Sequence, residues 1–147
     1  MSCTERSPGL RSTTLRAIAK ETLRLLGRPR ASVSIVLTGD EAVRALNRDF
    51  REVDKPTDVL SFPLADPEAL RDPETPVFLG EIYISLDTAR AQARGARRTF
   101  AREVAHLMVH GVLHLLGYDH HRTGDRKRMW AEERRVMRSV STLIASL

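Results

Sequence analysis

The chain has 147 residues, of which 41% are hydrophobic and 29% charged, with a formal net charge of +5 and a pI of about 10.1. This length predicts one domain with a sizeable core, and no apolar run approaches the ~20 residues of a membrane span. Nearly all the positive charge is arginine, whose planar guanidinium suits phosphate groups. An anionic partner is therefore one explanation of the charge, and a generally arginine-rich proteome is the other.

The first residues carry no sign of export. Cys3 is the single cysteine, so an intrachain disulfide is excluded, which fits a reducing compartment. Residues 1–12 are polar, contain Pro8 and Gly9, and lack the apolar region of a signal peptide. We expect a flexible tail at 1–12, a single domain at 13–147 and a cytoplasmic location without membrane contact.

Helical and alternating segments follow in chain order. Apolar residues at helical spacing predict helices over 12–26, 42–50 and 88–94, and alternation predicts strands over 32–37, 58–62 and 77–86. Thr38-Gly-Asp-Glu41 has the pattern of a capping box for the second helix, and Asp87 stands where it can cap the third. Residues 64–76 contain three prolines and predict a loop, which is either a binding element or a surface insertion.

The last third of the chain is helical. Residues 99–116 are apolar nearly all round the predicted helix, so this should be the buried central helix. A final helix is expected over 125–144. Its inner face is predicted from residues at helical spacing, namely Met129, Trp130, Glu133, Val136, Met137 and Val140. Strands separated by helices indicate an α/β or α+β layer, with a small mixed sheet backed by helices.

Three of the five histidines cluster in His110-Gly-Val-Leu-His114-Leu-Leu-Gly117-Tyr-Asp-His120. Residues four apart on a helix lie ~6 Å apart along its axis on one face, so His110 and His114 can share a metal ion. Gly117 stands where a glycine ends a helix, and the following turn could return His120 to the same ion. The spacing matches the metzincin zinc motif, except that Gly111 replaces the glutamate that serves as general base in peptidases.

The remaining histidines are interpreted differently. His106 lies ~12 Å along the helix axis from His114, so we expect it to be a buried, hydrogen-bonded helix residue. His121 competes with His120 and is expected to be solvated. Three neutral imidazoles with an open fourth position are typical of catalytic zinc, although Cu, Ni and Fe accept the same ligands. Asp119 either orients a ligand or caps the turn.

Two further blocks join this motif. They are Leu46-Asn-Arg-Asp-Phe-Arg51, followed by Lys55-Pro-Thr-Asp-Val-Leu-Ser-Phe-Pro63, and Gly80-Glu-Ile-Tyr-Ile-Ser85. Together with the histidine motif they resemble the signature of the bacterial YbeY endoribonucleases, also called ribosomal RNA maturation factors. The resemblance runs in order from about residue 33 to residue 137.

The resemblance implies a single α+β domain with a mixed, roughly four-stranded sheet and one Zn²⁺ held by His110, His114 and His120, at the end of the central helix. It implies a single-strand-specific endoribonuclease acting in small-subunit ribosomal RNA maturation and ribosome quality control. Ribosomal RNA precursors would be its substrate, and the small subunit and assembly proteins its partners. The family's functional arginine falls at Arg51 and its acidic residue at Glu81, a longer carboxylate than the common aspartate.

The mechanism follows as a hypothesis. Water on the zinc attacks the phosphodiester, or the zinc polarises it, while Arg51 clamps a phosphate oxygen and Glu81 carries a proton. Judged without the resemblance, Arg51 would be interpreted as a residue of a surface salt bridge at a helix end. Glu81 would be interpreted as a solvated carboxylate on a strand. Two other classes stay open: a metallopeptidase, which Gly111 disfavours, and a non-catalytic ribosome assembly factor with a structural zinc. The cut site, the general base, the oligomeric state and the role of 64–76 stay open as well.

Overall fold

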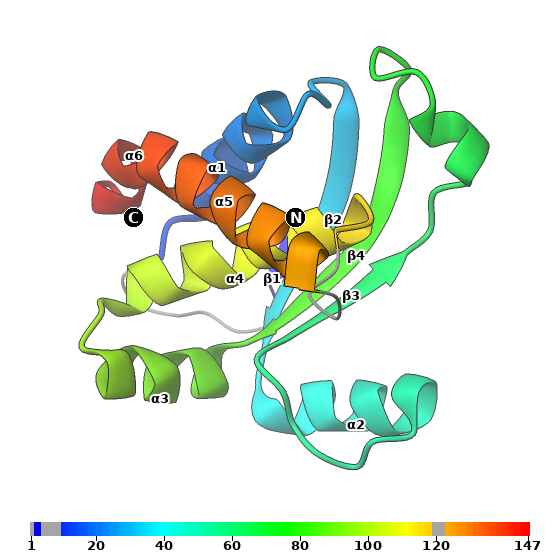
Figure 1. The fold of residues 1–147 in the computed structure, drawn as a ribbon. Coiled ribbons are helices and arrows are strands. Elements are labelled where there is room, and N and C mark those ends of the chain that lie inside the picture. Colours follow the sequence, from blue (N-terminus) through cyan, green and yellow to red (C-terminus); the bar gives the residue numbers. More distant parts are fainter. Residues whose placement is uncertain (1, 4–9, 119–122) are drawn as a thin grey trace.

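The computed structural model describes residues 2–3, 10–118 and 123–147. Its elements are β1 (Ser2–Cys3), α1 (Ser12–Leu25), β2 (Ala31–Thr38), α2 (Asp40–Arg51), β3 (Val59–Pro63), a short 3-10 helix η1 (Pro67–Leu70), β4 (Val77–Ser85), α3 (Leu86–Ala96), α4 (Phe100–Leu115), α5 (Thr123–Ser139) and α6 (Ser141–Ala145). Figure 1 labels all of them except η1. The predicted helices and strands are therefore present in the predicted order. Residues 1 and 4–9 lie outside the described residues, so the expected flexible tail stays a prediction.

The sheet is mixed. Its three longer strands run β2-β4-β3, with β2 parallel to β4 and β3 antiparallel to it. The two-residue β1 pairs in parallel with the outer edge of β2. A small α+β domain with a mixed sheet is confirmed, whereas the expected count of about four strands depends on β1 and stays a prediction.

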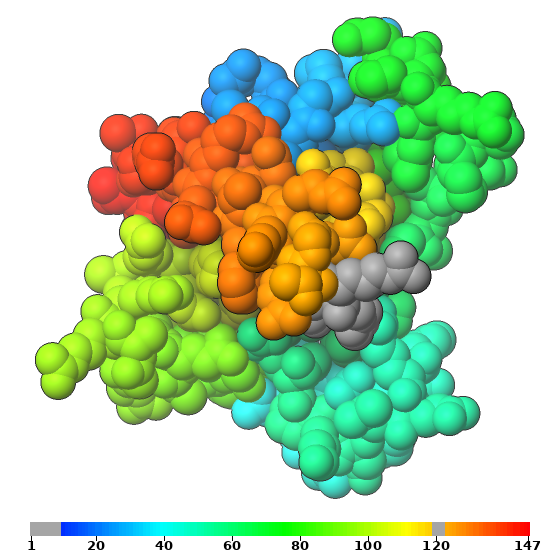
Figure 2. Space-filling view, in the orientation of Figure 1, coloured from blue at the N-terminus to red at the C-terminus, as the bar shows by residue number. Residues whose placement is uncertain are grey.

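The helix α4 forms the centre of the hydrophobic core. Its buried side chains contact α1, α3 and α5 and the inner face of the sheet. They include Val104, Leu107, Met108, Val112 and Leu113, each at most 3% exposed. In the space-filling view α5 lies across the centre of the face shown, between α1 above and α3 below (Figure 2). The prediction of a buried central helix is confirmed.

The N-termini of α2 and α3 stabilise each other across the fold. The carboxylate of Asp40 accepts hydrogen bonds from the hydroxyls of Ser85 and Thr88, at 2.5 and 2.6 Å. The carboxylate of Asp87 in turn accepts the backbone N–H of Asp40 at 2.9 Å. The capping box predicted from Thr38 is therefore wrong, and Ser85 rather than Asp87 caps α3. The cap of α3 is therefore local, whereas the partner of the α2 N-terminus, Asp87, comes from a tertiary contact.

The C-terminal helix is divided. The chain leaves helical geometry at the buried Val140, so α5 and α6 replace the single helix expected over 125–144. The predicted loop 64–76 contains η1, near whose start the Asp66 carboxylate accepts the backbone N–H of Glu68 at 3.0 Å. Among the described residues, no helix is both long and apolar enough to cross a membrane.

Candidate metal centre

The predicted histidine pair lies side by side on α4. The Nε2 atoms of His110 and His114 are 2.9 Å apart. Two nitrogens bound to one tetrahedral zinc at ~2.0–2.1 Å would lie about 3.3 Å apart, so the pair fits a shared ion closely. The helix ends as expected, because Gly117 has a positive φ of 93°. The proposed third ligand, His120, lies outside the described residues, as do His121 and Asp119, and their roles stay predictions.

Glu133 of α5 lies behind the pair. One carboxylate oxygen is 2.5 Å from Nδ1 of His110, and the other is 3.4 Å from Nε2 of His106. Burial raises the pKa of Glu133, but hydrogen bonds and charge from His106 and His110 outweigh it and lower this pKa from 4.5 to about 2. The ionised carboxylate can accept the Nδ1 proton of His110, which leaves Nε2 of that ring as the nitrogen able to bind a metal.

Sequence reasoning placed Glu133 on the inner face of the last helix without giving it a role. The available signal was an acidic residue at an inward position beside Met129, Val136 and Met137. A buried carboxylate needs a partner, and a histidine pair on the facing helix is a suitable one. His106 was expected to be a buried, hydrogen-bonded helix residue, and it is half-buried and hydrogen-bonded to the same carboxylate. Its Nδ1 atom has no hydrogen-bond partner among the described residues.

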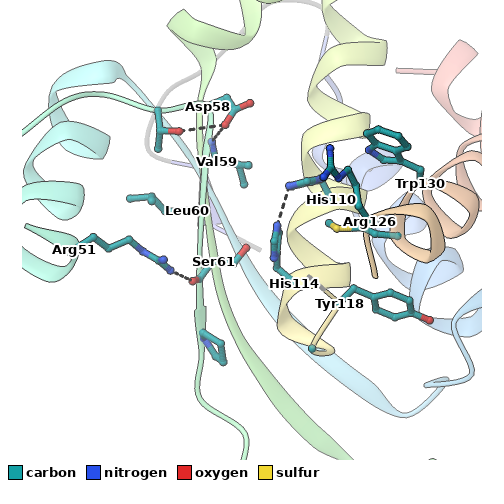
Figure 3. A pocket seen from close by; sticks show the side chains of 14 residues that line it. Arg51, Asp58, Val59, Leu60, Ser61, His110, His114, Tyr118, Arg126 and Trp130 are labelled. Carbon is teal, nitrogen blue, oxygen red and sulfur yellow. Dashed lines mark hydrogen bonds between the residues drawn. The ribbon is translucent and has the colours of Figure 1, made fainter. Parts of the chain in front are cut away.

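A cavity of about 840 Å³ opens beside the histidine pair. Figure 3 shows β3 and the end of α2 on one side, His110 and His114 on α4, and Arg126 and Trp130 of α5 beyond His110. The pair is thus at the wall of a wide cavity rather than enclosed in the core. Structural zinc sites are closed, whereas catalytic sites keep one position open to water or substrate.

The structure brings Arg51 into this cavity. The side chain leaves the last turn of α2, and its Nη2 donates a 2.8 Å hydrogen bond to the backbone carbonyl of Ser61 on β3. Its guanidinium also lies 5.6 Å from the centroid of the Phe62 ring. These two contacts hold a positive charge in the cavity that contains the histidine pair.

Glu81 does not lie beside the histidine pair. It alternates on β4 with Ile82, whose side chain packs beneath Gly111 of α4, so Glu81 and Tyr83 lie on the opposite face of the sheet. The Tyr83 hydroxyl donates to the Glu81 carboxylate at 3.1 Å. Glu81 is absent from the cavity lining, and its role as a proton carrier stays a prediction.

The chain is similar to proteins of one family. Residues 4–141 match the family model described as Endoribonuclease YbeY. A relative of that name from an Anaeromyxobacter species is 46% identical over 133 residues, which cover 90% of this chain and 67% of the relative. Another, from Geobacter metallireducens, is 40% identical and covers 83% of this chain and 81% of its own length. The solution structure of TM1509 from Thermotoga maritima matches with a TM-score of 0.67 and 27% identity, over 98% of this chain and 91% of that one.

Proposed function

Because this chain belongs to the YbeY endoribonuclease family, we propose that it is a zinc-dependent, single-strand-specific endoribonuclease. Its substrates are precursors of small-subunit ribosomal RNA, and it acts in ribosome quality control in the cytoplasm, with the small subunit and its assembly proteins as partners. The observation that carries the proposal is the 2.9 Å approach of the His110 and His114 Nε2 atoms at a cavity that also contains Arg51.

The residues have distinct roles in this proposal. His110 and His114 hold the zinc together with His120, and Glu133 orients the His110 ring. The ion supplies Lewis-acid polarisation of a phosphoryl oxygen and activation of water. Arg51 binds a phosphate oxygen. It is able to do so because its hydrogen bond to Ser61 uses one of the guanidinium donors and leaves the others for the phosphate.

Two features favour this activity over the other classes. A Cβ at Gly111 would lie 2.7 Å from Cγ2 of Ile82, so the glutamate of a metallopeptidase could not occupy this position without displacing Ile82. The wide cavity beside the histidine pair favours a catalytic ion over the purely structural zinc of an assembly factor.

Metal analysis paired with an RNA cleavage assay tests the proposal. His114→Ala should lose zinc and most cleavage of single-stranded RNA, and chelation of the wild-type protein should do the same. His106→Gln is the matched control, because His106 lies on the same face of α4 and contacts Glu133 but is not a proposed ligand. It should keep both zinc and cleavage. Equal cleavage by wild type and His114→Ala would point to a contaminating nuclease and remove the evidence for zinc catalysis.

A further inference from the structure

Trp130 is the exposed aromatic residue of the cavity wall. The helical pattern placed it on the inner face of its helix, yet 51% of the residue is exposed, whereas its neighbour Met129 is 1% exposed. Tryptophan is usually much more buried than this. Trp130 and Met129 both line the cavity that contains the histidine pair and Arg51. A large flat ring is thus presented to the place where the substrate would lie.

Cationic side chains lie next to this ring and across the cavity from it. The Arg126 guanidinium lies 5.8 Å from the Trp130 ring centroid, and Arg51 lines the other side of the cavity (Figure 3). Asp58 is the one acidic residue among the described residues of the lining, and its carboxylate accepts hydrogen bonds from the backbone N–H of Val59 at 2.8 Å and the side chain of Gln92 at 3.3 Å. The cavity therefore combines an aromatic face with cationic groups, the combination that binds single-stranded nucleic acids.

We propose that Trp130 stacks on an unpaired base of the RNA next to the phosphate held by Arg51 and the histidine site, and that Arg126 contacts the adjoining backbone. This inference rests on the proposed function and specifies how that site selects single strands. A base can lie against an aromatic side chain only when its own face is free, as in loops and single strands. In a duplex both faces of the base are already stacked, and presenting one would require flipping the nucleotide out.

The first test uses intrinsic fluorescence. Trp130 is the single tryptophan of the chain, so its emission reports on this position alone. The zinc-loaded protein is mixed rapidly with an eight-nucleotide single strand or with a blunt-ended duplex of the same base composition, and emission is recorded before cleavage proceeds. We expect quenching by the single strand and little change with the duplex, which has no unpaired loop. Binding of labelled single strand, seen by anisotropy, without any change in Trp130 emission would overturn the proposal.

The second test uses substitutions at the ring. Trp130→Leu keeps an apolar side chain but removes the aromatic face. It should raise Kd and KM for the single strand roughly 5- to 100-fold, the size of one base–aromatic stack, with kcat and zinc content little changed. Trp130→Phe should recover most of the affinity. Phe78→Leu is the control, because Phe78 is 46% exposed on β4 but does not line the cavity, and this variant should bind as wild type.

The outcomes separate this inference from the proposed function. If wild type cleaves RNA and Trp130→Leu has the same KM, Kd and strand preference, the stacking role is wrong and the endoribonuclease proposal stands. If wild type binds single strands through Trp130 but zinc-loaded protein never cleaves them, the stacking role is supported and the nuclease proposal falls. Equal losses in Trp130→Leu and Trp130→Phe would also contradict stacking.

Discussion

At the scale of single residues, the carboxylate of Glu133 organises the candidate metal centre. It contacts Nδ1 of His110 through one oxygen and Nε2 of His106 through the other. Its lowered pKa, about 2, keeps it ionised at neutral pH. The orientation of the His110 ring therefore depends on a residue from a different helix that binds no metal in this proposal.

Glu133→Gln should weaken zinc binding about 10- to 100-fold, since an amide accepts the His110 proton less strongly than a carboxylate. The affinity can be measured by competition with a chromophoric chelator. Glu132→Gln is the control, because Glu132 pairs with Arg135 rather than with a histidine, and this variant should leave zinc affinity unchanged. Equal affinity in wild type and Glu133→Gln would show that the carboxylate does not support the ligand.

At the scale of elements, the close packing of α4 on β4 positions the histidine pair. Gly111 lies directly over Ile82, and its carbonyl accepts a 3.3 Å hydrogen bond from the Ser61 hydroxyl of β3. Ser61 in turn accepts from Arg51 through its backbone carbonyl. The glycine thus allows α4 to lie close to β4, and its carbonyl connects α4 to Ser61 of β3, the residue whose backbone carbonyl accepts from Arg51.

Gly111→Ala should lower the free energy of unfolding by about 1–3 kcal/mol, because the new methyl group would overlap Ile82 in a filled core. Gly95→Ala is the matched change in α3, where a Cβ would meet no atom within 4 Å. Gly95→Ala should leave stability unchanged or raise it by about 0.5–1 kcal/mol, because glycine is unfavourable inside a helix. Urea unfolding of the zinc-loaded variants measures both, and equal gains in the two would show that Ile82 moves without cost.

At the scale of the whole molecule, the arginines behind the net charge of +5 differ in whether they already pair with a carboxylate or can contact RNA. Several exposed arginines already pair with carboxylates, such as Arg24 with Glu21 and Arg44 with Asp54. Arg51 instead donates to a neutral carbonyl within the cavity, so its charge is available to a phosphate. Position rather than total charge should therefore decide which arginines contribute to binding.

The salt dependence of RNA binding tests whether the position of an arginine decides its contribution. The logarithm of the affinity for single-stranded RNA should fall linearly with the logarithm of salt concentration, with a slope of about −0.7 per neutralised phosphate. Arg51→Gln should make the slope shallower by about 0.7, while Arg44→Gln, on the same helix but paired with Asp54, should leave it unchanged. Equal slopes in wild type and Arg51→Gln would exclude a phosphate contact by Arg51.

The sequence by itself determined most of the elements, the central position of α4, the pairing of His110 with His114 and the helix end at Gly117. Each depends on local periodicity or on the backbone preference of one residue, and both can be seen within a few turns of chain. The alternation also indicated three strands, although it could not indicate their order in the sheet.

Only the tertiary structure decided which distant groups meet. Glu133 is 23 residues from His110, and Arg51 reaches the histidine cavity only because β3 lies between α2 and α4. The exposure of Trp130 and the hydrogen bond from the first N–H of α2 to the Asp87 carboxylate, 47 residues away, were likewise invisible to local patterns. Periodicity specifies the face of a helix or strand on which a side chain lies. The partner of that side chain depends on how the helices and strands pack against one another, and that packing is set by the burial of the core as a whole.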